Sequence, residues 1–201
     1  MFPKIKEILS KIEIDKISPD RKVDLHVLSH FIQKKVNANE PVLLNFICTH
    51  NSRRSQFAQV WAKVVSKYFG IEIQSFSGGV EVTACNERTI ASLKRSGFQI
   101  SHEGEDNPRY FMKYDDKNEE IQLFSKLYDD FENAPRDFAA IMTCAHADEN
   151  CPVVTGCEER ITIRYNDPKE FDDTPIEEEK YDERSLEIAT EMLYVFSKII
   201  K

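Results

Sequence analysis

Hydrophobic residues follow two alternating patterns along the 201-residue chain. Short apolar or β-rich runs predict strands at residues 42–48, 71–77, 138–143 and 161–165. Apolar residues spaced three and four apart predict helices at residues 53–68, 86–97 and from about 177 or 182 to 200. Because strands alternate with helices, we predict an α/β fold: a doubly wound, mostly parallel four-stranded sheet flanked by helices.

The N-terminal part of the chain lies outside this alternation. Helical spacing of apolar residues predicts helices at 2–12 and 18–35, the second capped by Ser18. We therefore expect residues 1–40 to form an N-terminal helical extension and residues 41–201 to form the main domain. The residues expected on the apolar side of the second helix are Val23, Val27, Leu28, Phe31 and Ile32, with Leu25 to one flank.

Residues 98–136 are predicted to be an insertion in the main domain. Apolar runs at residues 110–114 and 121–127 flank an Asp-Asp-Lys-Asn sequence at 115–118, which predicts a β-hairpin. Acidic residues are concentrated at 170–184, where we expect a solvated loop that leads into the last helix.

Composition and charge narrow the class of protein. The formal net charge is −8 at pH 7, which argues against nucleic acid or a membrane surface as a partner. We find neither an apolar run long enough to span a membrane nor an N-terminal secretory signal, so we expect a cytoplasmic location. In a reducing compartment, five cysteines favour catalytic, redox or metal-binding roles over a disulfide framework.

The main chemical signal lies between the predicted strand at 42–48 and the helix that follows it. The strand ends at Cys48, and Arg54 and Ser55 open the helix. Backbone N–H groups at a helix start attract anions, and the same field favours a thiolate, so Cys48 is a candidate nucleophile. Arg54 offers a planar fork for two oxygens of an oxyanion, and Ser55 can donate a hydrogen bond to the sulfur. The predicted oxyanion-binding residues are Thr49, His50, Asn51, Ser52, Arg53, Arg54 and Ser55.

The same loop has a plainer interpretation. Cys48 can be a buried structural cysteine at a strand end, with Arg54 a solvated helix residue. Against this, Asn51 is a residue type that tolerates the left-handed backbone of a tight loop. The order of strand, loop and helix is also the context that an anion-binding loop requires.

Two more reactive residues follow predicted strands. Cys144 comes directly after the predicted strand at 138–143, and Asp167 comes just after the predicted strand at 161–165. Ligands of parallel sheets bind outside the carboxyl ends of the strands, so we expect Cys48, Cys144 and Asp167 at one edge. Asp167 is a candidate general acid there, and it can instead be a turn residue before Pro168.

Cys144 and Cys151 form a thiol pair seven positions apart in a polar segment. Fully extended, seven residues span about 24 Å, whereas a disulfide needs Cα atoms within about 7 Å, so the segment must fold back or rearrange. A thiol relay is then feasible: Cys144 attacks the sulfur of oxidised or covalently loaded Cys48, and Cys151 then attacks Cys144. Cys157 can take the place of Cys151 as the outer thiol.

Two interpretations of these cysteines involve no redox chemistry. Cys144 and Cys151 can be buried hydrophobic residues. A zinc site can instead be formed by Cys144, His146, Cys151 and Cys157, although their spacing matches no common zinc-binding motif.

Two motifs resemble those of a known family. Residues 48–55, CTHNSRRS, resemble the phosphate loop of low-molecular-weight protein tyrosine phosphatases and of arsenate reductases built on that fold. Residues 142–152, MTCAHADENCP, look like the redox segment of thioredoxin-coupled arsenate reductases. The resemblance covers about Pro41 to the C-terminus. The roles it implies are nucleophile for Cys48, oxyanion clamp for Arg54, redox relay for Cys144 and Cys151, and general acid for Asp167.

Three residues depart from the family pattern. His50 stands where a small residue is usual, and we expect its side chain to face solvent. Arg53 stands where the family often has cysteine, and it adds positive charge beside the loop. Gln59 stands near the place of an acidic residue that binds potassium in some of these reductases, which speaks against a potassium site. We expect no metal and no cofactor.

The preferred hypothesis is an arsenate reductase of the low-molecular-weight phosphatase fold. Its substrate is a small oxyanion, arsenate or a phosphoryl group, and its partner is a thioredoxin-like reductant. A second hypothesis is a phosphomonoesterase or protein tyrosine phosphatase that uses Cys48, Arg54 and Asp167 without a redox step. A third is a non-catalytic module that binds an oxyanion or a partner protein.

Overall fold

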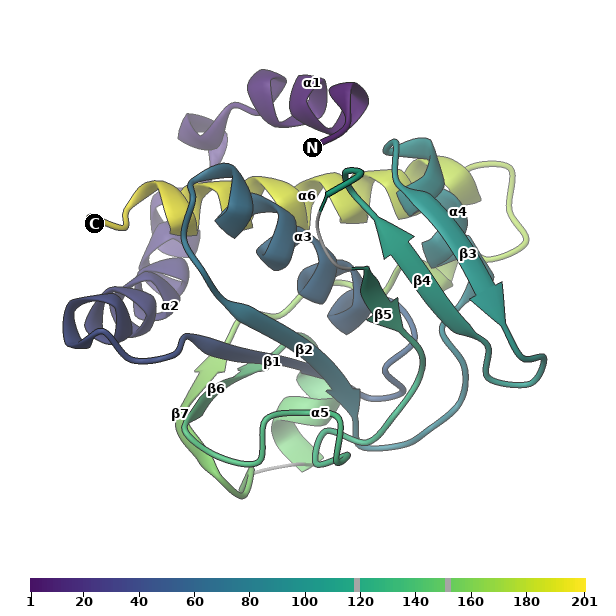
Figure 1. The fold of residues 1–201 in the computed structure, drawn as a ribbon. Helices are drawn as coiled ribbons and strands as arrows, with labels where there is room; N and C mark the ends of the chain where they lie inside the picture. Colours follow the sequence, from purple (N-terminus) through teal and green to yellow (C-terminus); the bar gives the residue numbers. More distant parts are fainter. Residues whose placement is uncertain (118–119, 151–152) are drawn as a thin grey trace.

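The predicted parallel sheet forms the centre of the fold (Figure 1). The computed structural model describes residues 1–117, 120–150 and 153–201. Four strands pair in the order β2-β1-β6-β7, and every pair is parallel. Their bounds are Leu43–Cys48 for β1, Gln74–Gly79 for β2, Phe138–Met142 for β6 and Cys157–Thr162 for β7. The predicted α/β fold class is therefore confirmed.

Helices flank this sheet. Their bounds are Pro3–Lys11 (α1), Pro19–Ala38 (α2), Arg54–Tyr68 (α3), Glu87–Arg95 (α4), Ala145–Asn150 (α5) and Glu177–Ser197 (α6), with 3₁₀ turns at Ile14–Lys16 (η1) and Pro168–Phe171 (η2). Helix α3 packs against β1, β2 and α6, whereas α5 packs against β1 and β6 (Figure 1). Across the described residues, no helix is both long and apolar enough to cross a membrane.

Side chains of β1 alternate between two apolar layers as far as Ile47, and Cys48 at the end of the strand joins the layer of Ile47. Leu44 and Phe46 are buried in the large core that also contains residues of α3 and α6. Ile47 is buried in a smaller core, which also contains Cys48 and Cys144. Both candidate thiols therefore belong to the same buried layer, although the sequence separates them widely.

Strand β2 lies further along the chain than predicted. It begins at Gln74, three residues late, and continues through Gly78 and Gly79. The Gly79 N–H donates to the Lys126 carbonyl at 2.8 Å, and a Cβ atom on Gly78 would lie 2.3 Å from the Tyr128 Cα. The two glycines extend the strand because, without side chains, they let residues 126–128 pass directly against it. The local hydrophobic pattern of residues 71–79 does not indicate this contact.

Strand β7 lies earlier than the predicted range of 161–165. It begins at Cys157 because the polar residues Glu158, Glu159 and Arg160 are part of the strand that pairs with β6. Their sequence has no apolar alternation that would predict a strand. Ile163 and Tyr165 continue the hydrogen bonding beyond the strand. Their N–H groups donate to the carbonyls of Met142 and Thr143, each at 3.0 Å.

Helix α2 buries a different face from the predicted one. Val23 and Val27 are 68% and 41% exposed, whereas Leu25 is fully buried. The predicted positions Leu28, Phe31 and Ile32 are buried as expected. The helix packs against α6, so its inward stripe is centred on the residues that reach α6 rather than on the most hydrophobic local face.

The 98–136 segment contains the predicted hairpin and one unpredicted strand. Strands β4 (Arg109–Lys113) and β5 (Ile121–Leu123) pair antiparallel, and β3 (Gln99–Glu103) adds to the outer side of β4. Most residues of β3 are exposed, so its sequence lacks the apolar alternation that signals a strand. Residues 118 and 119, between β4 and β5, lie outside the described residues.

Candidate active site

The loop between β1 and α3 is fixed by buried side-chain hydrogen bonds. Asn51 has the predicted left-handed backbone, with φ at 48°, and is fully buried. Its amide nitrogen donates to the Ser55 hydroxyl at 2.9 Å, and its amide oxygen accepts from the Lys126 N–H at 3.0 Å. The Gln56 side chain donates to the Asn51 carbonyl at 2.8 Å. These bonds hold the loop in one shape before any ligand binds.

Cys48 ends β1, and its sulfur lies 3.1 Å from the Ser55 hydroxyl oxygen. Because Asn51 already donates to that oxygen, the Ser55 hydrogen is free to point at the sulfur. A donor aimed at sulfur stabilises the thiolate over the thiol. The predicted contact between Ser55 and Cys48 is therefore confirmed as geometry.

Arg54 opens α3 and reaches the predicted acid. Its Nη2 donates to Asp167 Oδ2 at 2.6 Å, and its Nη1 donates to the Tyr165 carbonyl at 3.2 Å. Its Nε is buried and has no acceptor among the described residues. Since buried N–H groups are nearly always paired, this fork has an unused donor beside the loop.

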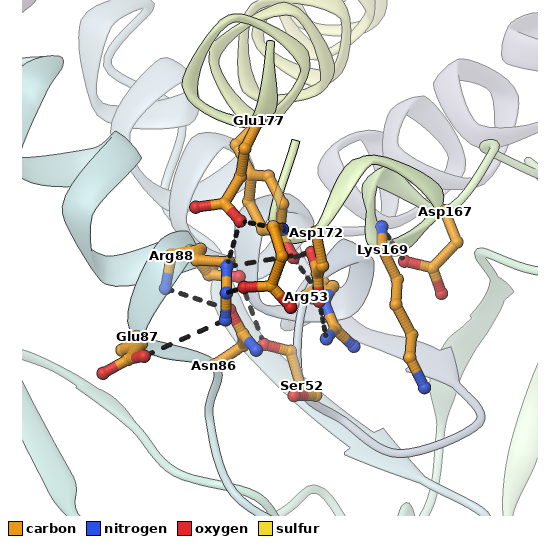
Figure 2. A network of polar contacts seen from close by, with 12 residues as sticks. Ser52, Arg53, Asn86, Glu87, Arg88, Asp167, Lys169, Asp172 and Glu177 are labelled. Atoms are coloured by element: carbon orange, nitrogen blue, oxygen red, sulfur yellow. Dashed lines mark hydrogen bonds and ion pairs between the residues drawn. The ribbon is translucent and has the colours of Figure 1, made fainter. Parts of the chain in front are cut away.

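The Arg53 side chain has different partners, and Figure 2 shows it beside Asp172. Its Nε donates to the Tyr181 hydroxyl at 2.7 Å, and its Nη2 donates to Asp172 at 3.2 Å. The Tyr181 hydroxyl donates to Asp172 at 2.7 Å, and burial together with this bond raises the pKa of Tyr181. Arg53 therefore ties the loop to α6, and its positive charge beside the loop is paired with Asp172.

Part of the acidic run at 170–184 belongs to the same network. Figure 2 shows Arg88 among Glu177 and Asp172 near the start of α6, and Arg88 also pairs with Asp173 at 2.7 Å. The Asp172 and Glu177 side chains are only 18% and 23% exposed. The prediction of a solvated acidic loop is therefore wrong for these residues, because arginines from the loop and from α4 neutralise them.

Cys144 lies beside the loop, next to its first residue. The Cys144 sulfur is 3.4 Å from the Thr49 hydroxyl oxygen and accepts from the Ala147 N–H at 3.4 Å. The same Thr49 oxygen is 3.3 Å from His146 Nδ1. Sequence reasoning did not single out Thr49 for this contact, because the two elements meet only in the folded chain. Cys151 lies outside the described residues.

The described residues, which do not include the candidate ligand Cys151, give no support to a zinc site. Cys144 and His146 meet at Thr49, and within the described residues no group of three or more histidine, cysteine, aspartate or glutamate side chains could hold a metal ion. Cys157 begins β7 and is half-buried.

Two departures from the family pattern have clear positions. The His50 side chain is 42% exposed, as expected, and its Nε2 lies 3.2 Å from Glu81. Gln59 is buried within α3, where it donates to the Gln122 carbonyl at 3.2 Å and accepts from Ser77 at 2.5 Å. Its amide therefore joins α3 to both sheets.

Asp148 anchors helix α5 to the strand side of the domain. Its carboxylate contacts Arg160, Thr162 and Arg164. Arg164 Nε donates at 2.8 Å, and Arg160 also donates to the Asp148 carbonyl at 2.6 Å. The three partners alternate along the chain, as residues on one face of an extended segment do. That alternation was the available sequence signal, but it did not identify Asp148 as the partner.

Replacing Asp148 by asparagine is expected to reduce stability at pH 7 and to flatten its acid dependence. Burial opposes ionisation of Asp148, but Arg164 and Arg160 outweigh it and hold its pKa below the ordinary value. The resulting stabilisation is present above about pH 4 and is lost as the pH falls through the lowered pKa. Urea unfolding at pH 7 and below pH 4 measures this. Glu149→Gln, an exposed change on the same helix, is the control, and equal acid dependence in both variants would contradict the prediction.

Fold and site together define the class of protein. A parallel four-stranded sheet carries, at the carboxyl end of β1, a cysteine followed by a loop and an arginine that opens a helix. Two solved structures share this fold. A YwlE mutant from Bacillus subtilis has a TM-score of 0.53 at 14% identity, covering 78% of this chain and 97% of that one. A low-molecular-weight protein tyrosine phosphatase from T. tengcongensis has a TM-score of 0.53 at 16% identity, covering 79% and 99%.

Curated relatives define the family more narrowly. Arsenate reductase 2 of Staphylococcus epidermidis is 32% identical over 124 residues, which are 61% of this chain and 76% of that protein. The arsenate reductase of Halalkalibacterium halodurans is 28% identical over 139 residues, 69% of this chain and 81% of that protein. No family model matches the chain. The chain belongs to the arsenate reductase family, and its fold resembles that of the low-molecular-weight protein tyrosine phosphatase from T. tengcongensis.

Proposed function

We propose that this protein reduces arsenate with two of its own thiols and then passes the disulfide to a thioredoxin-like reductant. The observation that carries the proposal is the position of Cys144. Its sulfur contacts the residue directly after Cys48, and both sulfurs belong to one buried apolar cluster. A hydrolase of this fold needs no second thiol at the loop, whereas a reductase does.

The first step is capture of the oxyanion by the 49–55 loop. Backbone N–H groups at the start of α3 face a bound anion, and the Arg54 fork matches two of its oxygens. Arg54 already pairs with Asp167 at 2.6 Å, so the anion joins an existing charge pair. Asp167 can take up a proton as the substrate binds and then donate it to the oxygen that leaves as water.

Replacing Arg54 by lysine is expected to lower kcat/KM about 100-fold, since the loss of one preorganised donor to a charged group costs about 100- to 1,000-fold. Arg53→Lys is the matched neighbour. It loses bonds to Tyr181 and Asp172 instead, so we expect about 1–2 kcal/mol less stability and a kcat/KM within about threefold. Steady-state kinetics and urea unfolding separate the two effects. Equal kinetic losses in both variants would contradict these assignments.

The redox steps follow from the positions of the thiols. Cys48 attacks arsenic, and water leaves, so a bond forms between sulfur and arsenic(V). Cys144 then attacks the Cys48 sulfur; the electron pair of the sulfur–arsenic bond goes to arsenic, which departs as arsenite, arsenic(III). The Cys48–Cys144 disulfide holds the two oxidised sulfurs. Cys151 attacks Cys144 and releases Cys48, and an external dithiol reduces the Cys144–Cys151 disulfide. This chemistry requires a reducing compartment, and we place the protein in the cytoplasm.

The test is arsenate-dependent oxidation of NADPH in the presence of thioredoxin and its reductase. We expect turnover with arsenate and none with phosphate, and the arsenite formed should equal the NADPH consumed. Absence of turnover with folded protein would reject the proposal.

A phosphatase activity is the second candidate, and the contact between Arg54 and Asp167 favours it. An acid beside the clamp can protonate the leaving oxygen of a phosphate monoester. The activity would be hydrolysis of p-nitrophenyl phosphate that needs Cys48 and Asp167 but neither Cys144 nor Cys151. Loss of hydrolysis in Cys144→Ser would contradict this candidate.

A further inference from the structure

Thr49 connects the second thiol to an imidazole. Its hydroxyl oxygen is 3.4 Å from the Cys144 sulfur and 3.3 Å from His146 Nδ1. Cys144 is 1% exposed, whereas His146, two residues later on α5, is exposed to solvent. The contacts therefore run from a buried thiol through one hydroxyl to a base that can exchange protons with water.

The direction of the bonds follows from the donors present. Of the described polar groups that contact the Cys144 sulfur, the Ala147 N–H can only donate, so the acceptor that these groups offer for the thiol proton is the Thr49 oxygen. The Thr49 hydroxyl can then donate its own hydrogen to His146 Nδ1, provided that the neutral imidazole carries its proton on Nε2.

We propose that His146 receives, through the Thr49 hydroxyl, the proton that Cys144 loses when it attacks Cys48. This inference rests on the proposed function, in which Cys144 is the second thiol. The Cys144 proton moves to Thr49 Oγ1 while the Thr49 proton moves to His146 Nδ1, so the hydroxyl is regenerated. The electron pair left on Cys144 forms the bond to Cys48, and His146 later releases its proton to water.

The remaining titratable groups near α5 do not offer this route. Among the described residues, the charged and titratable groups around it are Asp148, Glu149, Arg160, Arg164 and Cys48, and Tyr128 and Cys157 pack against the same apolar cluster. Asp148 is held by both arginines and is directed at them rather than at the thiol. Thr49 touches the reacting sulfur, and His146 acts through Thr49 as a positioning and proton-accepting residue.

The experiment isolates the step that uses the relay. In a Cys151→Ser parent, one equivalent of arsenate should convert the protein to a Cys48–Cys144 disulfide that goes no further. Rapid acid quench and mass spectrometry give the rate from pH 5 to 9. His146→Gln should lower this rate about 100-fold at pH 7, a typical loss for a general base.

The pH profile separates a proton relay from a structural role. In the parent, the rate should rise with pH as the imidazole becomes able to accept the proton. In His146→Gln the rise should move to higher pH, because the thiol must then lose its proton without this acceptor. Thr49→Val should behave like His146→Gln, and Thr49→Ser should retain most of the rate. His26→Gln on α2, far from the site in sequence, is the control for a histidine change.

The outcomes distinguish this inference from the proposed function. If the parent forms no Cys48–Cys144 disulfide, both are overturned. If the disulfide forms at the same rate and with the same pH profile in His146→Gln, the relay alone is overturned, and arsenate reduction by Cys48 and Cys144 stands. A displaced profile in both His146→Gln and Thr49→Val supports the relay.

Discussion

Serine in place of Cys48 is expected to reduce arsenate-dependent turnover by at least about 10⁴-fold, as removal of a nucleophile does in other covalent enzymes. A serine oxygen at this position is a protonated alcohol at neutral pH, and it cannot form a disulfide. The hydroxyl of Ser55, 3.1 Å from the sulfur, stabilises negative charge on a thiolate but cannot supply the missing sulfur chemistry.

The measurement is NADPH oxidation in the coupled assay, together with urea unfolding to show that the variant is folded. Cys85→Ala is the matched control, because Cys85 is another buried cysteine and its pKa is raised by burial. We expect that variant to lose some stability and to keep its turnover. Turnover of Cys48→Ser within tenfold of the natural protein would exclude Cys48 as the nucleophile.

Serine in place of Cys144 is expected to abolish repeated reduction of arsenate, with a loss of at least about 1,000-fold. The loop is untouched by this change, since Thr49 can still hydrogen-bond to a serine hydroxyl. Oxyanion binding should therefore remain, and phosphate should protect Cys48 from alkylation equally well before and after the change. The redox step alone should fail, because the sulfur at position 144 that receives the disulfide in the proposed sequence is missing.

Cys157→Ser is the comparison that tests the outer thiol. Cys157 begins β7 and is half-buried, so it was a plausible substitute for Cys151. In the proposed sequence, Cys151→Ser should stop turnover after one cycle and Cys157→Ser should not. The reverse result would make Cys157 the outer thiol. Full turnover in Cys144→Ser would reject the thiol relay, in which Cys144 takes the disulfide from Cys48.

Helix α5 must rearrange during the proposed cycle. The helix runs from Ala145 to Asn150, and six helical residues advance the chain by about 9 Å. A disulfide across the helix needs Cα atoms within about 7 Å, so at least part of it must unwind. The ion pairs of Asp148 with Arg160 and Arg164 hold α5 in place. We expect these ion pairs to oppose the unwinding and to add to the free-energy cost of forming the Cys144–Cys151 disulfide.

Local sequence was sufficient for the parallel sheet, its principal helices and the loop after Cys48. These features depend on residues close together in the chain: an apolar run that ends in cysteine, an asparagine suited to φ of 48°, and Arg54 at the first turn of α3. The convergence of Cys48, Cys144 and Asp167 at one edge also followed, since parallel strands place their carboxyl ends together.

Contacts between distant segments decided the rest. Arg53 and Arg54 are adjacent and chemically identical, yet one joins Tyr181 and the other joins Asp167. The loop sequence does not indicate which partner each arginine has, because both partners are contributed by the C-terminal part of the fold. The exposed strand β3, the buried face of α2 and the extension of β2 past Gly78 were set in the same way, by neighbours that periodicity does not record.

The same distinction applies to the chemistry. The sequence singled out Cys48 and Cys144 as candidate reactive thiols, because each follows a predicted strand at the edge where a parallel sheet binds its ligand. Only the folded chain brought the hydroxyl of Thr49 between Cys144 and His146, from segments nearly one hundred positions apart. Candidate reactive residues could therefore be named from single positions, whereas the proposed route for the proton depends on distances that only tertiary packing creates.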